Sequence, residues 1–388
     1  MTHLDGLIVR ATKKDRLEPQ VPTIVAALLN LPAPKPGRVS LLVPCYEVEA
    51  YFDTFLRSVI EQTYRDLEVI LVNDGAGPAT TNALRDAVPQ LEAAGFAVTL
   101  IEQENKGLGG AIDAGLKHVS GEFLMWPDPD DWLLPNSVER RVQLMRENPD
   151  VGLLRSNCQL FIEARQEFDG HFLPLDTPAR RVPNLFEDLV FQRFFYGPVC
   201  HMVRCSMFWQ VHTERTIWFS KASSQNFQML VPFVESFPVL QVPEVLACYR
   251  VREDSRSRAQ TKTHEKLMGR HEQLYELTLH TLPKLKTYSS ERAAALLNQH
   301  WRNKMLPTAI RGKMKSKGLL LIQRADLAPW RKALAKACLT LRCSPVFDKA
   351  DSHTGRISSR VLARILDWTV RMPDREAIWG AGPLWAAS

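Results

Sequence analysis

The sequence lacks long hydrophobic runs, a secretory leader pattern and a cysteine pattern typical of metal sites. No stretch of about 18 consecutive apolar residues occurs, so no transmembrane helix is predicted. Met1 is not followed by an apolar run, which argues against a secretory signal. The seven cysteines are scattered, odd in number and without metal-ligand spacing, which favours reduced thiols. We therefore expect a cytoplasmic protein.

The composition is that of a globular protein with an uneven charge distribution. Hydrophobic residues make up 45% of the chain and charged residues 24%, which excludes wholesale disorder. The 388 residues are enough for two or three domains. Residues 262–388 contain 23 Lys and Arg against 10 Asp and Glu, whereas residues 1–261 are net acidic. This asymmetry indicates that the C-terminal part meets an anionic partner.

Three regions differ in pattern along the chain. Residues 1–37 are expected to form an N-terminal extension that ends in a stiff, proline-rich linker at 31–37. Residues 38–261 alternate between apolar strand-like runs and segments with helical spacing. Residues 262–388 have a helical and basic pattern without strand alternation. We detect no internal repeat and no low-complexity segment.

The alternation in the second region predicts an open α/β sheet with right-handed crossovers. In such sheets ligands bind beyond the carboxyl ends of the strands, and the polar motifs of this chain fall at those ends. The expected strands cover 39–43, 67–72, 97–101 and 122–126, and the expected helices cover 51–62, 80–94 and 110–119.

The strongest chemical signal is an acidic cluster, Trp126-Pro-Asp-Pro-Asp-Asp-Trp132, at the end of the fourth expected strand. Its three carboxylates repel one another unless a cation or a set of hydrogen-bond donors holds them. Hard divalent cations take carboxylate oxygens and bridge them to phosphate oxygens. The alternative is an acidic loop that caps a helix starting near Pro135.

Two further motifs follow strands two and three. Asp74, in Asn-Asp-Gly, could bind a base or a ribose by hydrogen bonds, but Asp-Gly is also a common turn pair. The stretch Asn105-Lys-Gly-Leu-Gly-Gly-Ala111 could bring a nucleotide close to the backbone through its glycines, or it could be a plain helix start.

Taken in order, these segments resemble the family 2-type inverting glycosyltransferases, which have a GT-A fold with a Rossmann-like, open mixed sheet. The resemblance covers about residues 39–160 and resumes at 242–257. The matching segments are Val43–Tyr46, Ser58–Thr63, Val72–Gly75, Asn105–Gly107 with Ala111 and Gly115, Ser120–Glu122, Asp128–Asp131, Val242–Leu246, and Tyr249–Arg250 with Ser255 and Ser257.

The resemblance implies a hexosyltransferase that uses a nucleotide-diphosphosugar, most simply a UDP-sugar, and a glycan or lipid-linked acceptor, as in cell-envelope polysaccharide synthesis. It implies that Asp130 acts in catalysis and holds Mn²⁺ or Mg²⁺ on the diphosphate. It also implies that Asp128 reaches the ribose or the sugar. The remaining donor-side residues would be Pro44, Tyr46, Glu49, Asp74, Asn105 and Gly107.

The sequence departs from the family where a Glu-Asp pair usually supplies the catalytic base. Gln225 and Asn226 stand there, and an amide cannot take up a proton as an ordinary base does. Either another carboxylate has the role, with Glu187, Asp188 and Glu235 as candidates, or the protein is a weak or inactive glycosyltransferase-like binding or scaffold protein.

A second departure lies near the end of the domain. Arg252 stands where the family often has a histidine that ligates the metal. Arginine is a permanent cation and ligates no metal, but it could pair with the diphosphate directly. We therefore count Arg252 among the donor-binding residues.

The C-terminal region contains one further pattern. Arg356, Arg360 and Arg364 form one stripe of an amphipathic helix whose other face is apolar. Such a helix can lie on an anionic membrane, which would place the protein peripherally on the inner face, or it can pack on the catalytic domain. No interleaved aromatic and basic recognition motif accompanies it, so we expect no nucleic-acid partner.

Overall fold

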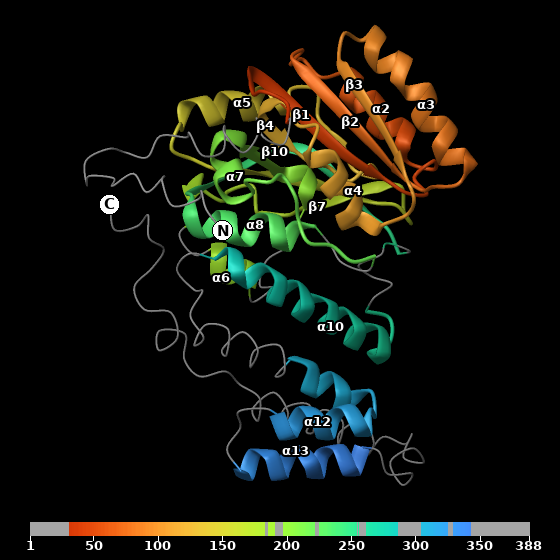
Figure 1. Cartoon of the computed structure of the whole chain (residues 1–388), viewed down its shortest axis with the longest axis vertical. Helices are drawn as coiled ribbons and strands as arrows, with labels where there is room; N and C mark the ends of the chain where they lie inside the picture. Colours follow the sequence, from red (N-terminus) through yellow and green to blue (C-terminus); the bar gives the residue numbers. More distant parts are fainter. Residues whose placement is uncertain are drawn as a thin grey trace, which may run out of the picture.

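The computed structural model describes residues 31–182, 185–190, 197–221, 225–253, 255, 261–285, 304–324 and 329–342. Strands and helices alternate through the first half of this chain, and helices alone make up the last part (Figure 1). The predicted α/β architecture is confirmed.

A single mixed sheet organises the domain, with the strand order β3-β2-β1-β4-β9-β6-β10-β5. The first four strands run parallel, β9 is antiparallel to both of its neighbours, and β10 is parallel to β6. The strands are β1 (Lys35–Cys45), β2 (Leu67–Asp74), β3 (Ala97–Gln103), β4 (Gly121–Met125), β5 (Trp132–Leu133), β6 (Leu153–Ile162), β7 (Glu167–His171), β8 (Arg180–Arg181), β9 (His201–Arg204) and β10 (Val239–Val251).

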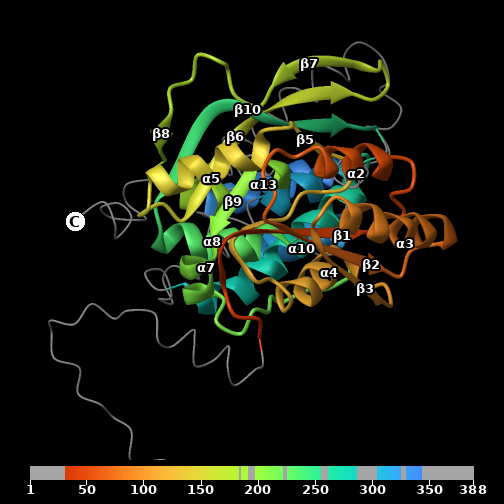
Figure 2. The same cartoon turned by 90° about the horizontal axis from the view of Figure 1, so that it is seen from above.

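Helices cover both faces of the sheet (Figure 2). Because side chains alternate along a strand, Leu41 and Val43 of β1 point into one core while Leu42 points into the other. The helices are α2 (Phe52–Ile60), α3 (Pro78–Ala93), α4 (Gly107–Leu116), α5 (Ser137–Glu147), α6 (Leu185–Val190), α7 (Cys205–Val211), α8 (Asn226–Ser236), α10 (His264–Thr281), α12 (Lys315–Arg324) and α13 (Pro329–Arg342), with single 3₁₀ turns at Pro198–Cys200 and Leu282–Lys284. Helices α2, α3 and α5 pack against the first core, and α4, α7 and α8 against the second.

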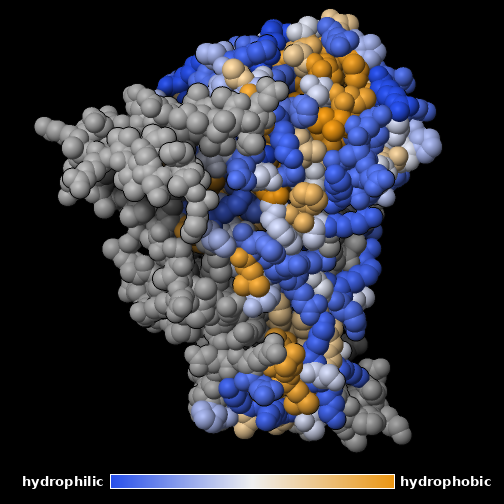
Figure 3. Space-filling view, viewed as in Figure 1, coloured by the Kyte–Doolittle hydropathy of each residue, from blue (hydrophilic) through white to orange (hydrophobic). Residues whose placement is uncertain are grey.

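The C-terminal helices continue away from the sheet. Leu277 of α10 is buried in the same core as α8, so α10 is packed onto the part of the molecule that contains the sheet. Helices α12 and α13 lie side by side at the far end (Figure 1). Leu319 and Leu320 of α12 are exposed there, and hydrophobic surface is visible at this end (Figure 3).

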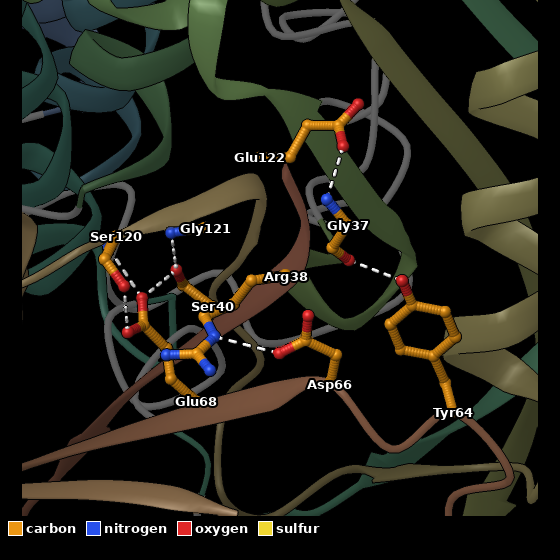
Figure 4. A network of polar contacts seen from close by, with 9 residues as sticks. All are labelled: Gly37, Arg38, Ser40, Tyr64, Asp66, Glu68, Ser120, Gly121 and Glu122. Atoms are coloured by element: carbon orange, nitrogen blue, oxygen red, sulfur yellow. Dashed lines mark hydrogen bonds and ion pairs between the residues drawn. The ribbon is translucent and has the colours of Figure 1, made fainter. Parts of the chain in front are cut away.

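A polar network fixes the amino ends of the parallel strands (Figure 4). The buried Glu68 carboxylate accepts hydrogen bonds from the hydroxyl of Ser40 and from the backbone N–H of Ser120, the latter at 2.6 Å. The Ser40 hydroxyl oxygen in turn accepts the N–H of Gly121 at 2.9 Å. A buried charge with this many donors is stabilised, so the network holds β1, β2 and β4 in register. The opposite, carboxyl ends remain for ligands.

Strand and helix boundaries differ from expectation by a few residues. Strand β1 begins at Lys35, so the end of the expected linker already belongs to the sheet. Strand β2 continues through Asn73 and Asp74, because both pair with β3. The helix expected from 110 begins at Gly107.

Candidate functional site

Asp74 lies at the carboxyl end of β2, where it accepts hydrogen bonds from the end of β3 and from the loop that follows β3. Its side chain is 2% exposed, and Oδ1 accepts hydrogen bonds from Lys106 N at 2.8 Å and from Gln103 Nε2 at 2.7 Å. Gly75 follows with φ +67°, and a Cβ there would lie 2.6 Å from Asn105 N. The loops after β2 and β3 are therefore held together, as the sequence predicts for a shared edge of the sheet.

The loop after β1 presents one exposed aromatic ring. Pro44 is buried within the strand, whereas Tyr46 is 50% exposed. The Glu49 carboxylate accepts the hydroxyl of Thr80, a hydrogen bond that holds the pKa of Glu49 below its usual value. Glu49 thus ties this loop to α3, and Tyr46 offers a ring face for a planar group.

Gly107 makes room for the protein's own backbone. It has φ +79°, and a Cβ there would lie 2.4 Å from the carbonyl oxygen of Lys221. The crossing segment is fastened to α4, because Asp113 Oδ1 accepts the Thr216 hydroxyl at 2.6 Å and Ile217 N at 2.9 Å. The glycine therefore serves internal packing at this position, and Asn105, half-buried beside it, remains at the edge of the sheet.

Three carboxylates converge just after β4. Asp128, Asp130 and Asp131 each offer an oxygen within 4.8 Å of the others, which is the spacing of a possible cation site. Asp131 is 1% exposed, and its Oδ1 accepts Arg250 N at 2.9 Å, while its Oδ2 has no hydrogen-bond partner.

The environment of Asp131 disfavours its ionised form. Burial raises the pKa of Asp131 well above its usual range, and the negative charges of Asp130 and Asp128 raise it further. A cation bound between the three carboxylates would reverse this effect and use the unpartnered oxygen. The residues present therefore fit a divalent metal.

Two arginines at the end of β10 reach this cluster. Arg252 Nη2 lies 2.7 Å from Asp130 Oδ2, and the two side chains are 20% and 22% exposed. Arg250 donates from Nε to the Asp130 backbone oxygen at 2.9 Å and forms an ion pair with Glu163. Both guanidinium groups lie over the ring of Tyr51, at 5.0 Å for Arg250 and 4.5 Å for Arg252.

The two amides at the expected position of the base lie at the start of α8. Asn226 is the first residue of this helix, and its Oδ1 accepts the indole N–H of Trp126 at 2.8 Å. Trp126 is the first residue of the acidic motif, so Asn226 is linked to that motif. Gln225 is 1% exposed, and neither atom of its amide has a hydrogen-bond partner.

The three carboxylates that are alternative candidates for the base lie on helices α6 and α8. Glu235 is on α8 and 3% exposed, nine residues after Asn226 and hence about 13 Å further along the helix axis. Asp188 lies half-buried on α6, and the side chain of Glu187 is outside the described residues. Helix α6 packs against α8, and Asn226 at the start of α8 contacts Trp126 of the acidic motif.

Sequence reasoning missed Tyr51, Trp126 as a hydrogen-bond donor, Arg250 as a contact of the acidic motif, and Glu163. The only local signal was the tryptophan inside the acidic motif itself.

The basic stripe Arg356, Arg360 and Arg364 lies outside the described residues. Within the part of the chain that the structure describes, no helix combines the length and apolar character needed to cross a membrane.

Residues 40–211 match the family model described as glycosyl transferase family 2. This segment is a family 2 glycosyltransferase domain. Among relatives, glycosyltransferase GlyA of Streptococcus pneumoniae serotype 4 is 27% identical over 234 residues, which are 58% of this chain and 32% of the relative. An uncharacterized glycosyltransferase of Nostoc sp. is 31% identical over 153 residues, which are 39% of this chain and 44% of the relative. The chain thus matches less than half the length of these two relatives.

A solved structure is similar over most of the chain. Residues 1–349 of TarS from S. aureus, in complex with UDP, superpose with a TM-score of 0.50 at 15% identity, covering 84% of this chain and 91% of that one. The complex of the same protein with UDP-GlcNAc also has a TM-score of 0.50. This likeness shows that the family 2 domain has the GT-A fold, as expected from the sequence.

Proposed function

We propose that this chain transfers a hexosyl unit, with inversion, from a nucleotide-diphosphosugar to a glycan or lipid-linked acceptor, as in cell-envelope polysaccharide synthesis. The observation that supports this most directly is the convergence of Asp128, Asp130 and Asp131 at the carboxyl edge of the sheet in a family 2 domain. Asp74 and Tyr46 lie on the same edge, after neighbouring strands. A donor with a nucleoside at one end and a diphosphate at the other suits this layout.

On this proposal the nucleoside binds at the loops after β1, β2 and β3. Tyr46 offers an exposed ring on which a base can stack. The side chain of Asn105 and the carboxylate of Asp74 would provide polar groups for the base and the ribose. TarS was solved with UDP and UDP-GlcNAc, which supports a UDP-sugar as the first donor to test.

The acidic motif would receive the diphosphate. Mn²⁺ or Mg²⁺ held by Asp130, with Asp128 and Asp131 near it, would neutralise the charge that develops on the leaving nucleoside diphosphate. Arg252 adds a permanent positive charge within reach of the same region. Asp128 would contact the ribose or the sugar.

Transfer requires an acceptor hydroxyl to attack the anomeric carbon from the face opposite the leaving group. Asn226 stands where the resemblance implies a base, and its amide can orient a hydroxyl or a water but cannot take its proton. Trp126 fixes the side chain of Asn226 through its indole N–H. Gln225 adds a second buried amide without a partner, which a bound acceptor hydroxyl could satisfy.

The two amides at the position of the base, Gln225 and Asn226, also favour a second candidate function. A domain with amides in place of the base could bind the donor without efficient turnover and act as a binding or scaffold protein. Donor hydrolysis separates the two candidates, because only an enzyme releases the nucleoside diphosphate catalytically.

Two measurements test the proposal, each with and without Mn²⁺. One screens nucleotide sugars for hydrolysis, and the other measures UDP binding by calorimetry. Asp130→Asn should abolish hydrolysis and the metal-dependent part of UDP affinity. Asp169→Asn, an exposed carboxylate on β7 paired with Arg165, is the control with the same charge change. Unchanged metal-dependent affinity in Asp130→Asn would refute the assignment of the metal site.

We also propose that the basic C-terminal region contacts an anionic membrane or a lipid-linked acceptor. The net charge of residues 262–388 supports this, as do the exposed Leu319 and Leu320 of α12, which follow the exposed Lys315 and Lys317. Removing residues from about 350 onward should lower binding to anionic vesicles more than it lowers donor hydrolysis. Equal vesicle binding of both forms, or none by either, would make the helix that carries Arg356, Arg360 and Arg364 a packing element.

A further inference from the structure

We propose that Arg252 is an internal counter-cation for Asp130, which holds this carboxylate until the diphosphate of the donor draws the guanidinium away. The divalent metal would then bind together with the nucleotide and not before it. This inference rests on the proposed donor site and assigns to Arg252 a positioning role in its loading.

The starting point is the short contact between the two side chains. Arg252 Nη2 lies 2.7 Å from Asp130 Oδ2, which is the length of a charge-assisted hydrogen bond. Asp130 is one of the three carboxylates whose oxygens lie within 4.8 Å of one another. The guanidinium therefore occupies one oxygen of a carboxylate that belongs to the candidate metal site.

Arg252 is positioned for this contact by its neighbours. Its guanidinium carbon lies 4.5 Å from the centre of the Tyr51 ring, a stacking contact that orients the group toward Asp130. The adjacent Arg250 is held differently, because it donates to the Asp130 backbone and forms an ion pair with Glu163. Arg250 therefore has a carboxylate partner outside the acidic motif, whereas Arg252 pairs with the Asp130 side chain.

The exposure of the pair allows exchange. Arg252 and Asp130 are 20% and 22% exposed, so neither side chain is locked in the core. Arg252 directly follows the last residue of β10, Val251, and its side chain can turn without a change in the sheet. A diphosphate offers pairs of oxygens that the planar guanidinium can bind in a bidentate way.

The energetic consequence is a coupling between metal and nucleotide. Without nucleotide, a metal ion must displace a cation from Asp130 and remain close to it, which costs affinity. With nucleotide, the displaced guanidinium gains the phosphate oxygens. Each ligand then raises the affinity of the other by the same factor, as linkage requires.

The experiment is a titration of Mn²⁺ into the full chain, with and without UDP, with free Mn²⁺ followed by electron paramagnetic resonance. The unmodified chain should bind Mn²⁺ weakly alone and more tightly with UDP, within the roughly 5- to 150-fold range of such couplings. Arg252→Gln should bind Mn²⁺ alone about fivefold more tightly, the scale of a lost, partly exposed ion pair. Its coupling to UDP should fall.

Two variants serve as controls. Arg165→Gln removes the same charge from a side chain that contacts Glu167 and Asp169, and should leave Mn²⁺ binding and coupling unchanged. Arg252→Lys keeps the charge but not the planar fork, so it should retain weak Mn²⁺ binding without UDP. Thermal unfolding checks that each variant is folded, and Arg252→Met removes the same charge if Arg252→Gln is not folded.

The outcomes separate this inference from the proposed function. If Arg252→Gln binds Mn²⁺ alone no more tightly than the unmodified chain, the role of Arg252 is refuted, while UDP-dependent Mn²⁺ binding leaves the donor site intact. If the unmodified chain binds no Mn²⁺ even with UDP, the metal site of the proposed function fails and the role of Arg252 fails with it. If Arg252→Lys binds Mn²⁺ alone as tightly as Arg252→Gln, positive charge at this position is not what restrains the metal.

Discussion

Acid should destabilise this protein through a buried histidine that supports α8, the helix that begins at Asn226. His212 follows α7 and is 2% exposed, and its Nε2 lies 3.0 Å from the backbone oxygen of Met229 on α8. That contact assigns the proton to Nε2, and Nδ1 has no hydrogen-bond partner. Burial, with a smaller effect from the charge of Lys284, lowers the pKa of His212 to about 3.

The sign follows from comparison with the unfolded chain. An unfolded histidine titrates near pH 6.5. Below about that pH, His212 is protonated in the unfolded chain but remains neutral in the folded protein. The free energy of unfolding therefore falls as the pH falls from about 6.5 toward 3. Between pH 7 and pH 5 the loss from His212 alone is about 2 kcal/mol, from the two titration curves.

Urea unfolding at pH 7 and pH 5 measures this loss in the unmodified chain and in His212→Gln. Glutamine does not titrate, and its amide can still donate to the Met229 oxygen. His201 is also buried with a lowered pKa, but it titrates in both proteins and cancels from the difference. If the two proteins lose the same stability within about 0.5 kcal/mol, the error usual for independent sites, the reasoning is refuted.

The remaining predictions concern glycines and the amide at the base position. Gly115→Ala should destabilise by about 1–3 kcal/mol in urea unfolding, because the new Cβ would lie 2.0 Å from Leu42 Cδ1, whereas Gly269→Ala, with nothing within 4 Å, should stabilise by about 0.5–1 kcal/mol. Equal effects of the two would contradict the packing argument. Asn226→Asp should raise donor hydrolysis about 10²-fold or more, since a carboxylate can still accept the Trp126 N–H and can also take a proton; an unchanged or lower rate places the base elsewhere.

The parallel half of the fold could be predicted because its signals are local. Strand β2 is buried along its whole length, and α2 buries residues at helical spacing, so sequence runs and periodicity coincide with structure. The apolar run predicts that β2 ends at Val72, two residues too early, because polar residues continue its hydrogen bonding to β3. Asn73 and Asp74 pair with Glu102 and Gln103, and apolar runs carry no information about such pairing.

The other half could not be derived in this way, because it depends on contacts distant in sequence. Strand β9 inserts between β4 and β6, and β10 shifts register twice along β6. The approach of Lys221 to Gly107 joins segments more than a hundred residues apart. A glycine-rich helix start is compatible with a ligand or with such a crossing, and only the three-dimensional arrangement distinguishes them.

The candidate site was predictable in its residues and not in its contacts. The acidic motif and Asp74 lie at the carboxyl edge, as strand order implies. The ion pair between Asp130 and Arg252 needs the end of β10 to lie beside the loop after β4, which no local pattern encodes. Glu49 illustrates the opposite case, because a residue expected at the donor is committed to Thr80.

The two departures from the family pattern act on charge in the same direction. Asn226 in place of an aspartate and Arg252 in place of a histidine each make the surroundings of the acidic motif more positive by up to one charge. On the proposed reaction, added positive charge stabilises the donor and the nucleoside diphosphate product alike, and such uniform binding raises affinity without raising the turnover number. If no other carboxylate supplies the base, the transfer step itself is slowed. An intact acidic motif beside these changes therefore favours an enzyme with tight nucleotide binding and slow turnover, in which UDP should be a strong product inhibitor.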